Sequence, residues 1–242
     1  MKGRDFLFLA VAVALLAVSC DMADLERTAL KTAEEYQARG LEYLDNGNYD
    51  SAIADFTKAI NLDPDYAEAY HSRGRAYNER GRVYADKGDW EMEWADYERA
   101  AVDWADGTIL LANQAIQLNP NDADAYCWRG WAYSDKKEYG RAFADFAYAI
   151  RLDPNHFYTY YARGLANYDR EDYDNAIADL SQAIRIEPSN IWIYYFRGEV
   201  YLCKDDYDRA IADYEAILLI APDSFFAEYR IKDIQQMKEL YN

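Results

Sequence analysis

The fold is decided by residues 160–188, which read YYARGLANYDREDYDNAIADLSQAIRIEP. Two further stretches repeat this pattern: residues 36–64 read YQARGLEYLDNGNYDSAIADFTKAINLDP, and residues 126–154 read YCWRGWAYSDKKEYGRAFADFAYAIRLDP. Apolar and small residues recur in each stretch at helical spacing, and a turn signal such as Asn46-Gly47-Asn48 divides the stretch into two halves. The pattern therefore predicts a unit of two helices that the chain uses several times.

The five prolines give the length of this unit. They are Pro64, Pro120, Pro154, Pro188 and Pro222. The last four follow one another at a constant interval, and only the first gap is longer. A proline removes a backbone donor and biases the preceding residue away from helix, so each proline ends the second helix of a unit.

In its 34-residue period and its motifs, the stretch from residue 33 to residue 224 resembles the tetratricopeptide repeat (TPR) family. The resemblance implies an all-α, right-handed solenoid of five helical hairpins. The expected units are residues 33–66, 67–122, 123–156, 157–190 and 191–224, followed by a capping helix at 225–242.

Small and large residues divide the packing between the helices of a unit. Glycine recurs on the first helix and alanine on the second, where small side chains let two backbones approach closely. Large residues such as Tyr133 and Phe146 fill the neighbouring holes. The chain has 24 tyrosines, and 13 of them occupy three recurrent positions, so we interpret these 13 as packing residues.

One polar pair recurs at a constant spacing of 16 residues, with one member on each helix of a unit. The pairs are Arg39 and Asp55, Arg80 and Asp96, Arg129 and Asp145, Arg163 and Asp179, and Arg197 and Asp213. The arginines suit either an anion site or internal ion pairs. Since each arginine has a carboxylate at the same spacing, we expect internal ion pairs.

The second unit, residues 67–122, is longer than the other four. RGRAY at 73–77 is followed seven residues later by RGRVY at 80–84, so we expect a hairpin that projects by two helical turns, roughly 10 Å. Trp90, Met92 and Trp94 should lie near its tip. The registers of the two helices differ by eight residues more than a straight extension allows, so we expect a break or kink at Asp106-Gly107-Thr108. Three interpretations of the tip stay open: contact with a partner, self-association through residues 78–107, or packing of the hairpin against itself.

The N-terminus has the pattern of a targeting signal. Residues 1–19 read MKGRDFLFLAVAVALLAVS, with two basic residues before an apolar run of 13. This run is shorter than the roughly 20 residues that span a bilayer, and it suits a signal peptide. It leads through small residues into Cys20, which resembles the lipobox of bacterial lipoproteins. That resemblance implies a lipidated Cys20 followed by a tether at 20–32, and a place in the bacterial cell envelope, anchored to the membrane and facing the periplasm or the exterior. The alternative is ordinary signal cleavage with an unmodified Cys20.

Composition argues against several classes of function. The net charge is −18, and an acidic surface repels phosphate, so we expect no nucleic-acid partner. The chain has 2 His and 3 Cys, which leaves little for a zinc site, a disulfide framework or a histidine-based active site. The sequence also contains no P-loop, GxSxG or HExxH motif. We therefore expect no enzymatic activity, no cofactor and no metal.

The candidate binding residues come from the resemblance. In TPR proteins the first helices line a concave groove, and in the last three units the groove positions are aromatic. The residues concerned are Trp131, Tyr158, Tyr161, Tyr168, Trp192 and Tyr195. Tyr and Trp dominate binding hot spots, so we predict that these six form one continuous patch that binds a partner. The alternative is that they pack on the C-terminal helix or on each other.

Together these features predict a lipid-anchored scaffold of the cell envelope that binds a protein or peptide of neutral or basic character. The resemblance to bacterial TPR lipoproteins implies such an adaptor role. A second hypothesis is a periplasmic binder of a small hydrophobic molecule that serves a transporter. An open groove favours the first hypothesis, and a closed cavity capped by residues 225–242 favours the second.

Overall fold

A computed structural model describes residues 32–241, which form eleven α-helices and no strand. The helices are α2 (Ala33–Asp45), α3 (Tyr49–Leu62), α4 (Ala67–Asp86), α5 (Trp90–Leu118), α6 (Ala123–Asp135), α7 (Tyr139–Leu152), α8 (Phe157–Asp169), α9 (Tyr173–Ile186), α10 (Ile191–Cys203), α11 (Tyr207–Ile220) and α12 (Phe225–Tyr241). The all-α fold predicted from the sequence is confirmed. Residues 1–31, and with them the predicted signal peptide and Cys20, lie outside the described residues.

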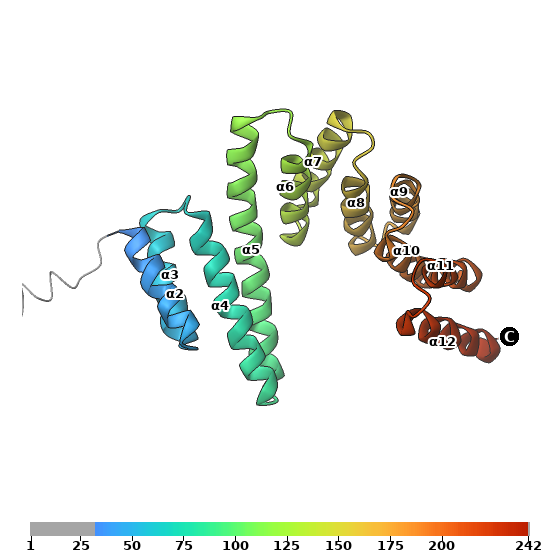
Figure 1. The fold of residues 1–242 in the computed structure, drawn as a ribbon, viewed down its shortest axis with the longest axis horizontal. Coiled ribbons are helices and arrows are strands. Elements are labelled where there is room, and N and C mark those ends of the chain that lie inside the picture. The colour runs from blue at the N-terminus through green and yellow to red at the C-terminus, as the bar shows by residue number, and fades with distance from the viewer. Residues whose placement is uncertain (1–31, 242) are drawn as a thin grey trace, which may run out of the picture. The chain divides into compact units, whose positions relative to one another are not determined.

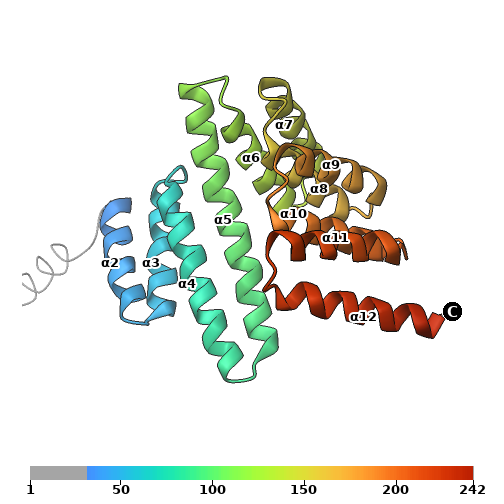
Figure 2. The same ribbon diagram turned by 45° about the vertical axis from the view of Figure 1, so that its right-hand side comes forward.

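The chain divides into two compact units. The N-terminal unit ends at Tyr97 and contains α2, α3, α4 and the start of α5; the C-terminal unit begins at Glu98 and contains the rest of α5 and helices α6 to α12. In the N-terminal unit α3 packs against both α2 and α4 (Figure 1). In the C-terminal unit α6 packs on α7, α8 on α9 and α10 on α11, while α12 lies along α11 (Figure 2).

Turn chemistry sets the ends of the helices. Asp172 precedes α9 and its side chain accepts a hydrogen bond from the backbone N–H of Asn175, which satisfies a donor that the helix leaves free. The turn between the two helices of a hairpin needs a left-handed residue, and Gly47 and Gly88 supply it with φ of 72°. In the later hairpins non-glycine residues adopt this conformation, with φ of 60°, 60° and 55° at Lys137, Glu171 and Asp205.

Each hairpin closes where a glycine of its first helix faces a large side chain of its second helix. A Cβ atom added at Gly130 would lie 2.8 Å from Cε1 of Phe146 and 3.1 Å from the carbonyl oxygen of Ala142. Phe146 is fully buried at this contact. The approach recurs between Gly40 and Phe56, Gly81 and Tyr97, Gly164 and Leu180, and Gly198 and Tyr214. Glycine at these positions therefore permits the close approach of the two helices.

The predicted ion pairs within the hairpins are confirmed. Arg163 donates through Nε and Nη2 to the two carboxylate oxygens of Asp179, at 2.9 and 2.6 Å. The same two-pronged bond joins Arg39 to Asp55, Arg80 to Asp96, Arg129 to Asp145 and Arg197 to Asp213. The guanidinium groups are thus occupied by buried carboxylates, and the alternative of an anion site is not supported.

Tyrosine rings surround these guanidinium groups. The Arg39 guanidinium lies 5.6 Å from the ring centre of Tyr36 and 5.9 Å from that of Tyr43. Arg80 and Arg197 each lie between two tyrosines in the same manner. Cation–π contact therefore gives many of the recurrent tyrosines a structural role.

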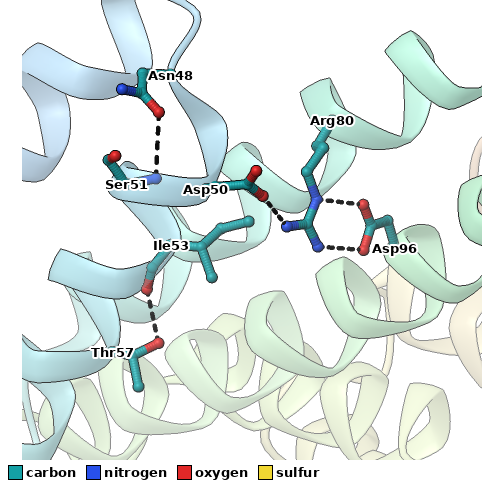
Figure 3. A network of polar contacts seen from close by, with 7 residues as sticks. All are labelled: Asn48, Asp50, Ser51, Ile53, Thr57, Arg80 and Asp96. Carbon is teal, nitrogen blue, oxygen red and sulfur yellow. Dashed lines mark hydrogen bonds and ion pairs between the residues drawn. The ribbon is translucent and has the colours of Figure 1, made fainter.

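Further polar contacts join one hairpin to the next. The third nitrogen of the Arg197 guanidinium donates to Ser181 of the preceding hairpin at 2.9 Å, and Lys204 pairs with Asp174 at 2.5 Å. In the N-terminal unit Arg80 bonds to Asp50 of α3 as well as to Asp96 (Figure 3). These contacts fix the register between neighbouring repeats.

The C-terminal helix α12 repeats the position of a first helix, because its start follows that of α10 at the same interval at which α10 follows α8. Ala227 and Ile234 are fully buried in a cluster with residues of α11. Arg230 donates to Glu199 of α10 at 2.5 Å, and Lys238 pairs with Asp208 of α11. The helix is therefore packed on the last complete hairpin by apolar and charged contacts together.

The long second hairpin differs from the expectation in one respect. Its first helix, α4, has 20 residues where α2 has 13, which confirms the seven-residue extension. The predicted break at Asp106-Gly107-Thr108 is wrong, because α5 continues without interruption from Trp90 to Leu118 (Figures 1 and 2). None of the three residues lacks a backbone donor, and a glycine inside a helix costs only about 1 kcal/mol. The additional residues therefore extend the helix, giving α5 29 residues against the 20 of α4.

Candidate functional site

The candidate site is a row of aromatic side chains on successive first helices of the C-terminal unit. On α6 and α8, the rings of Trp131 and Tyr158 stack with their centres 5.6 Å apart and their planes inclined by 13°. Tyr161, one turn along α8, lies 6.1 Å from Trp131 and 5.8 Å from Tyr158. Three of the six predicted residues thus form one cluster.

Phe196 of α10 connects this cluster to the remaining rings. Its ring lies 5.8 Å from Tyr161 and 5.2 Å from Tyr195. Tyr195 in turn contacts Trp192 at 6.1 Å, and Trp192 stacks on Phe226 of α12 at 6.2 Å with the planes only 3° apart. The row therefore extends over α6, α8, α10 and α12, and we call it the aromatic face.

The rings of the aromatic face are held by packing on one side and are exposed to solvent on the other. Trp192 is 55% exposed, whereas Tyr158, Tyr161 and Tyr195 are half-buried. Burial raises the pKa of Tyr161 to about 12 and also raises that of Tyr158, so both hydroxyls stay neutral. A partner would therefore meet rings that are already held in place and hydroxyls that can donate a hydrogen bond.

Three members of this face escaped the sequence prediction: Trp128, Phe196 and Phe226. Trp128 contacts Tyr158 with ring centres 5.0 Å apart and is 46% exposed. Phe196 is adjacent to Tyr195, and Trp128 lies one turn before Trp131 on α6. Phe226 is on the C-terminal helix, which was considered only as a cap. Their aromatic character on first helices was the available signal.

Tyr168 departs from the prediction of one continuous row. Its ring contacts Tyr173 of α9 at 6.1 Å, and its hydroxyl oxygen lies 3.8 Å from the sulfur of Cys203 in a hydrogen bond. It makes no ring contact with the aromatic face among the described residues, because its place near the end of α8 turns it toward the next hairpin. Tyr168 and two rings of the aromatic face, Trp131 and Phe196, line the same pocket.

This pocket lies between α6, α8 and α10 and has a volume of about 140 Å³. Aromatic side chains, small side chains and two carboxylates form its walls. The lining residues are Trp131, Ser134, Asp135, Ala162, Leu165, Ala166, Tyr168, Asp169 and Phe196. Burial and the neighbouring Asp169 raise the pKa of Asp135 to about 6, and burial raises the pKa of Asp169 as well.

A second, mainly apolar pocket of about 280 Å³ adjoins the other end of the face. It lies between α5 and α6, where Trp128 of α6 and the 44% exposed Leu111 of α5 form part of its wall. An apolar partner side chain would fit here, so the accessible apolar surface extends beyond the rings themselves.

The described cysteine, histidine and carboxylate side chains outside the aromatic face show no sign of a reactive or metal-binding site. Cys127 is fully buried, and burial raises the pKa of its thiol to about 12, which makes it unreactive. His156 bonds to Thr159 at 2.6 Å and to Asp124 at 2.8 Å. Within residues 32–241 no three His, Cys, Asp or Glu side chains lie close enough to hold a metal ion, and no helix has the length and hydropathy to span a bilayer.

The comparisons with known proteins agree on the repeat. A TPR repeat profile matches residues 40–81 and 166–205, and two tetratricopeptide repeat profiles match residues 111–144 and 193–224. No curated protein matches the chain in sequence.

Several solved structures of other proteins are similar to this chain. TTC0263, a thermophilic TPR protein of Thermus thermophilus, is 20% identical over 85% of this chain and 100% of its own, with a TM-score of 0.50. MamA of Desulfovibrio magneticus RS-1 is 20% identical over 80% of this chain and 97% of its own, with a TM-score of 0.47. YrrB, described as a TPR protein with an unusual peptide-binding site, is 18% identical over 81% and 90%, with a TM-score of 0.43. At 20% identity the likeness to TTC0263 concerns the fold alone.

Proposed function

Because the chain belongs to the tetratricopeptide repeat family, we propose that it is a scaffold that binds an extended protein or peptide segment on the aromatic face. The rings pack on one another and on Phe226 of the C-terminal helix in an unbroken row from Trp131, as the packing alternative expected. The observation that carries this proposal is that the packed row still leaves Trp128 46% and Trp192 55% exposed. Exposed rings of this size are costly to leave in water, and they offer large contact area with few torsions to freeze.

The dimensions of the face suit an extended segment better than a small molecule. Neighbouring packed helices are about 10 Å apart, so a face over four first helices extends for roughly 30 Å, the length of about nine extended residues. The pockets at the two ends of the face measure about 140 and 280 Å³, and both are smaller than the about 300–1,000 Å³ that is typical of small-molecule sites. Trp192, at the α12 end, remains 55% exposed rather than enclosed by that helix.

The net charge of −18 also influences which partner segments approach the protein. An acidic molecule attracts basic segments and repels acidic ones, which changes the association rate more than the affinity. We therefore propose a partner segment that is neutral or basic.

The proposal includes a lipid anchor at Cys20 and a place in the bacterial cell envelope. It is supported by the basic residues, the apolar run and the small residues that precede Cys20 in the sequence. Full-length protein should take up a fatty-acid analogue in bacteria and partition into detergent, whereas Cys20→Ser should do neither. Equal labelling of the two proteins would refute the anchor and leave the binding proposal intact.

Binding can be tested by selecting random twelve-residue peptides on the purified protein and measuring their affinities. The variant Trp131→Ala/Trp192→Ala should lose at least about 30-fold in affinity if the two rings are hot spots, while helicity measured by circular dichroism stays nearly unchanged. Trp90→Ala/Trp94→Ala removes two exposed tryptophans from the N-terminal unit and serves as the matched control.

Two results would contradict the proposal. If the Trp131→Ala/Trp192→Ala variant binds the selected peptides as tightly as the wild type, the binding surface lies elsewhere. If that variant loses its helicity, the two rings belong to the core and do not form a binding surface.

A further inference from the structure

The pocket between α6, α8 and α10 combines aromatic rings with carboxylates. Its walls include the rings of Trp131, Tyr168 and Phe196, and its lining also contains the carboxylates of Asp135 and Asp169. Carboxylates attract a cation, and a ring that presents its face to a cation attracts it as well. The protein around the pocket removes part of the water from the two carboxylates, but both Asp residues are exposed on their outer side and are therefore accessible to a partner.

The two carboxylates lack the ion pairs that the other structural carboxylates possess. In the part of the chain that the structure describes, no basic side chain lies within ion-pair distance of Asp135 or Asp169. The neighbouring cations are engaged elsewhere: Lys136 pairs with Asp106, and Arg170 covers the rings of Tyr139 and Phe143. Lys137 acts on Asp169 only at longer range, lowering its pKa against the larger effect of burial.

Asp135 and Asp169 occupy helix positions where a negative charge destabilises the fold. Asp135 is the last residue of α6 and Asp169 the last residue of α8. The C-terminal end of a helix carries partial negative charge, which repels an anionic side chain. The pKa of both groups is raised, which also indicates that the folded chain disfavours their charged forms. A cation placed between them would relieve this repulsion.

We infer that the pocket receives one cationic side chain, a lysine or an arginine, from the segment that binds the aromatic face. The aliphatic stem of such a side chain would pass over Trp131 and Phe196, and its charged end would lie between Asp135 and Asp169. Charge complementarity commits the pocket to this occupant, and the volume of about 140 Å³ suits a single side chain. The inference rests on the proposed function, since the cation arrives as part of the bound segment.

The test compares selected peptides that differ in one charge. Peptides selected on the wild-type protein should share one lysine or arginine at a fixed distance from their apolar residues. Replacing that residue by norleucine, which keeps the stem and removes the charge, should weaken binding about tenfold. On Asp135→Asn/Asp169→Asn the two peptides should bind equally. Glu215→Gln/Asp223→Asn removes two exposed carboxylates of α11 and the following turn and should retain the tenfold preference.

A pH titration provides a second readout of the same site. Asp135, with a pKa of about 6, must be ionised to attract the cation, so the preference for lysine over norleucine should decline as the pH falls below about 6. The groups that face Asp135 are Asp169 and Tyr158 of α8, with Lys137 and Tyr139 across the adjoining turn. Of these only Asp169 also loses its charge on acidification, and its protonation likewise reduces the preference for lysine over norleucine.

The outcomes separate this inference from the proposed function. Selected peptides without a common lysine or arginine, or a preference that persists in Asp135→Asn/Asp169→Asn, would overturn the cation pocket while leaving the binding scaffold in place. Failure to select any peptide would contradict the proposed function, and the pocket with it. The norleucine comparison on the wild-type protein needs no variant, so the inference stays testable even if the double substitution disturbs folding.

Discussion

Replacing Gly130 by alanine tests the close helix approach on which every hairpin depends. The added Cβ would lie 2.8 and 2.9 Å from Cε1 and Cδ1 of Phe146 and 3.1 Å from the carbonyl oxygen of Ala142. Overpacking a core costs about 1–3 kcal/mol, and we expect the upper part of this range because one contact is to backbone. Alanine recovers about 1 kcal/mol of helix propensity. The net loss of unfolding free energy should be about 2 kcal/mol, which lowers the Tm by about 4–8 °C in a chain of this size.

Gly140→Ala is the matched control for this prediction. Gly140 lies near the start of α7, and an added Cβ would meet nothing within 4 Å. The same substitution there should raise the unfolding free energy by up to about 1 kcal/mol. Urea denaturation of both variants measures the difference, which should be about 3 kcal/mol. If Gly130→Ala proves neutral or stabilising, the close approach of α6 and α7 is wrong.

A third variant checks that the loss comes from the clash with Phe146. Phe146→Ala alone should cost about 3–5 kcal/mol because it leaves a cavity in the core. In combination with Gly130→Ala the new methyl group occupies part of that cavity, so the combined cost should be smaller than the sum of the two. Simple additivity would show that the two positions do not touch.

Three further predictions concern the ion pairs, the turns and the hairpin tip. Arg163→Met leaves the buried carboxylate of Asp179 without its guanidinium and should lower the unfolding free energy by about 2–3 kcal/mol. Arg185→Met, on the exposed side of α9, should change it by less than about 0.5 kcal/mol. Equal effects of the two substitutions would show that the Arg163–Asp179 pair does not stabilise the fold. Lys137→Gly removes a left-handed non-glycine residue and should raise the unfolding free energy by about 0.5–1 kcal/mol, so a lower Tm would contradict the assigned turn. Trp90→Ser/Trp94→Ser at the tip, where the side chains are 70% and 67% exposed, should weaken self-association in sedimentation experiments without changing the Tm, and unchanged sedimentation would exclude this role.

Much of the fold could be predicted because its determinants are local and repeated. The regular spacing of the last four prolines marks the ends of the second helices, and the 16-residue separation of Arg163 from Asp179 marks the two helices of one hairpin. Repetition makes such signals reliable, since an accident would not recur at the same spacing. At Gly107 there was no repeat to compare, and the composition of three residues suggested a break where the helix continues.

The candidate site could be predicted only in part. Trp131, Tyr158, Tyr161, Trp192 and Tyr195 were found from their first-helix positions, and the structure brings all five into the aromatic face. Phe196 was missed because its neighbour Tyr195 was assigned the groove position, although both rings contribute. The pocket of Asp135 and Asp169 depends on how the ends of α6 and α8 approach each other, which no spacing along the chain reveals.

The most direct test of the binding face is to ask which residue touches the bound partner. A photoreactive benzoylphenylalanine at position 192 replaces an exposed ring of the aromatic face, and the same residue at position 94 replaces an exposed ring in the N-terminal unit. Both proteins would be irradiated in intact cells, and cross-linked products would be identified by mass spectrometry. We predict a cross-link from position 192 to a partner segment that contains a lysine or arginine, and no cross-link to that segment from position 94. A cross-link to the partner segment from position 94 alone would contradict the assignment of the aromatic face as the binding surface.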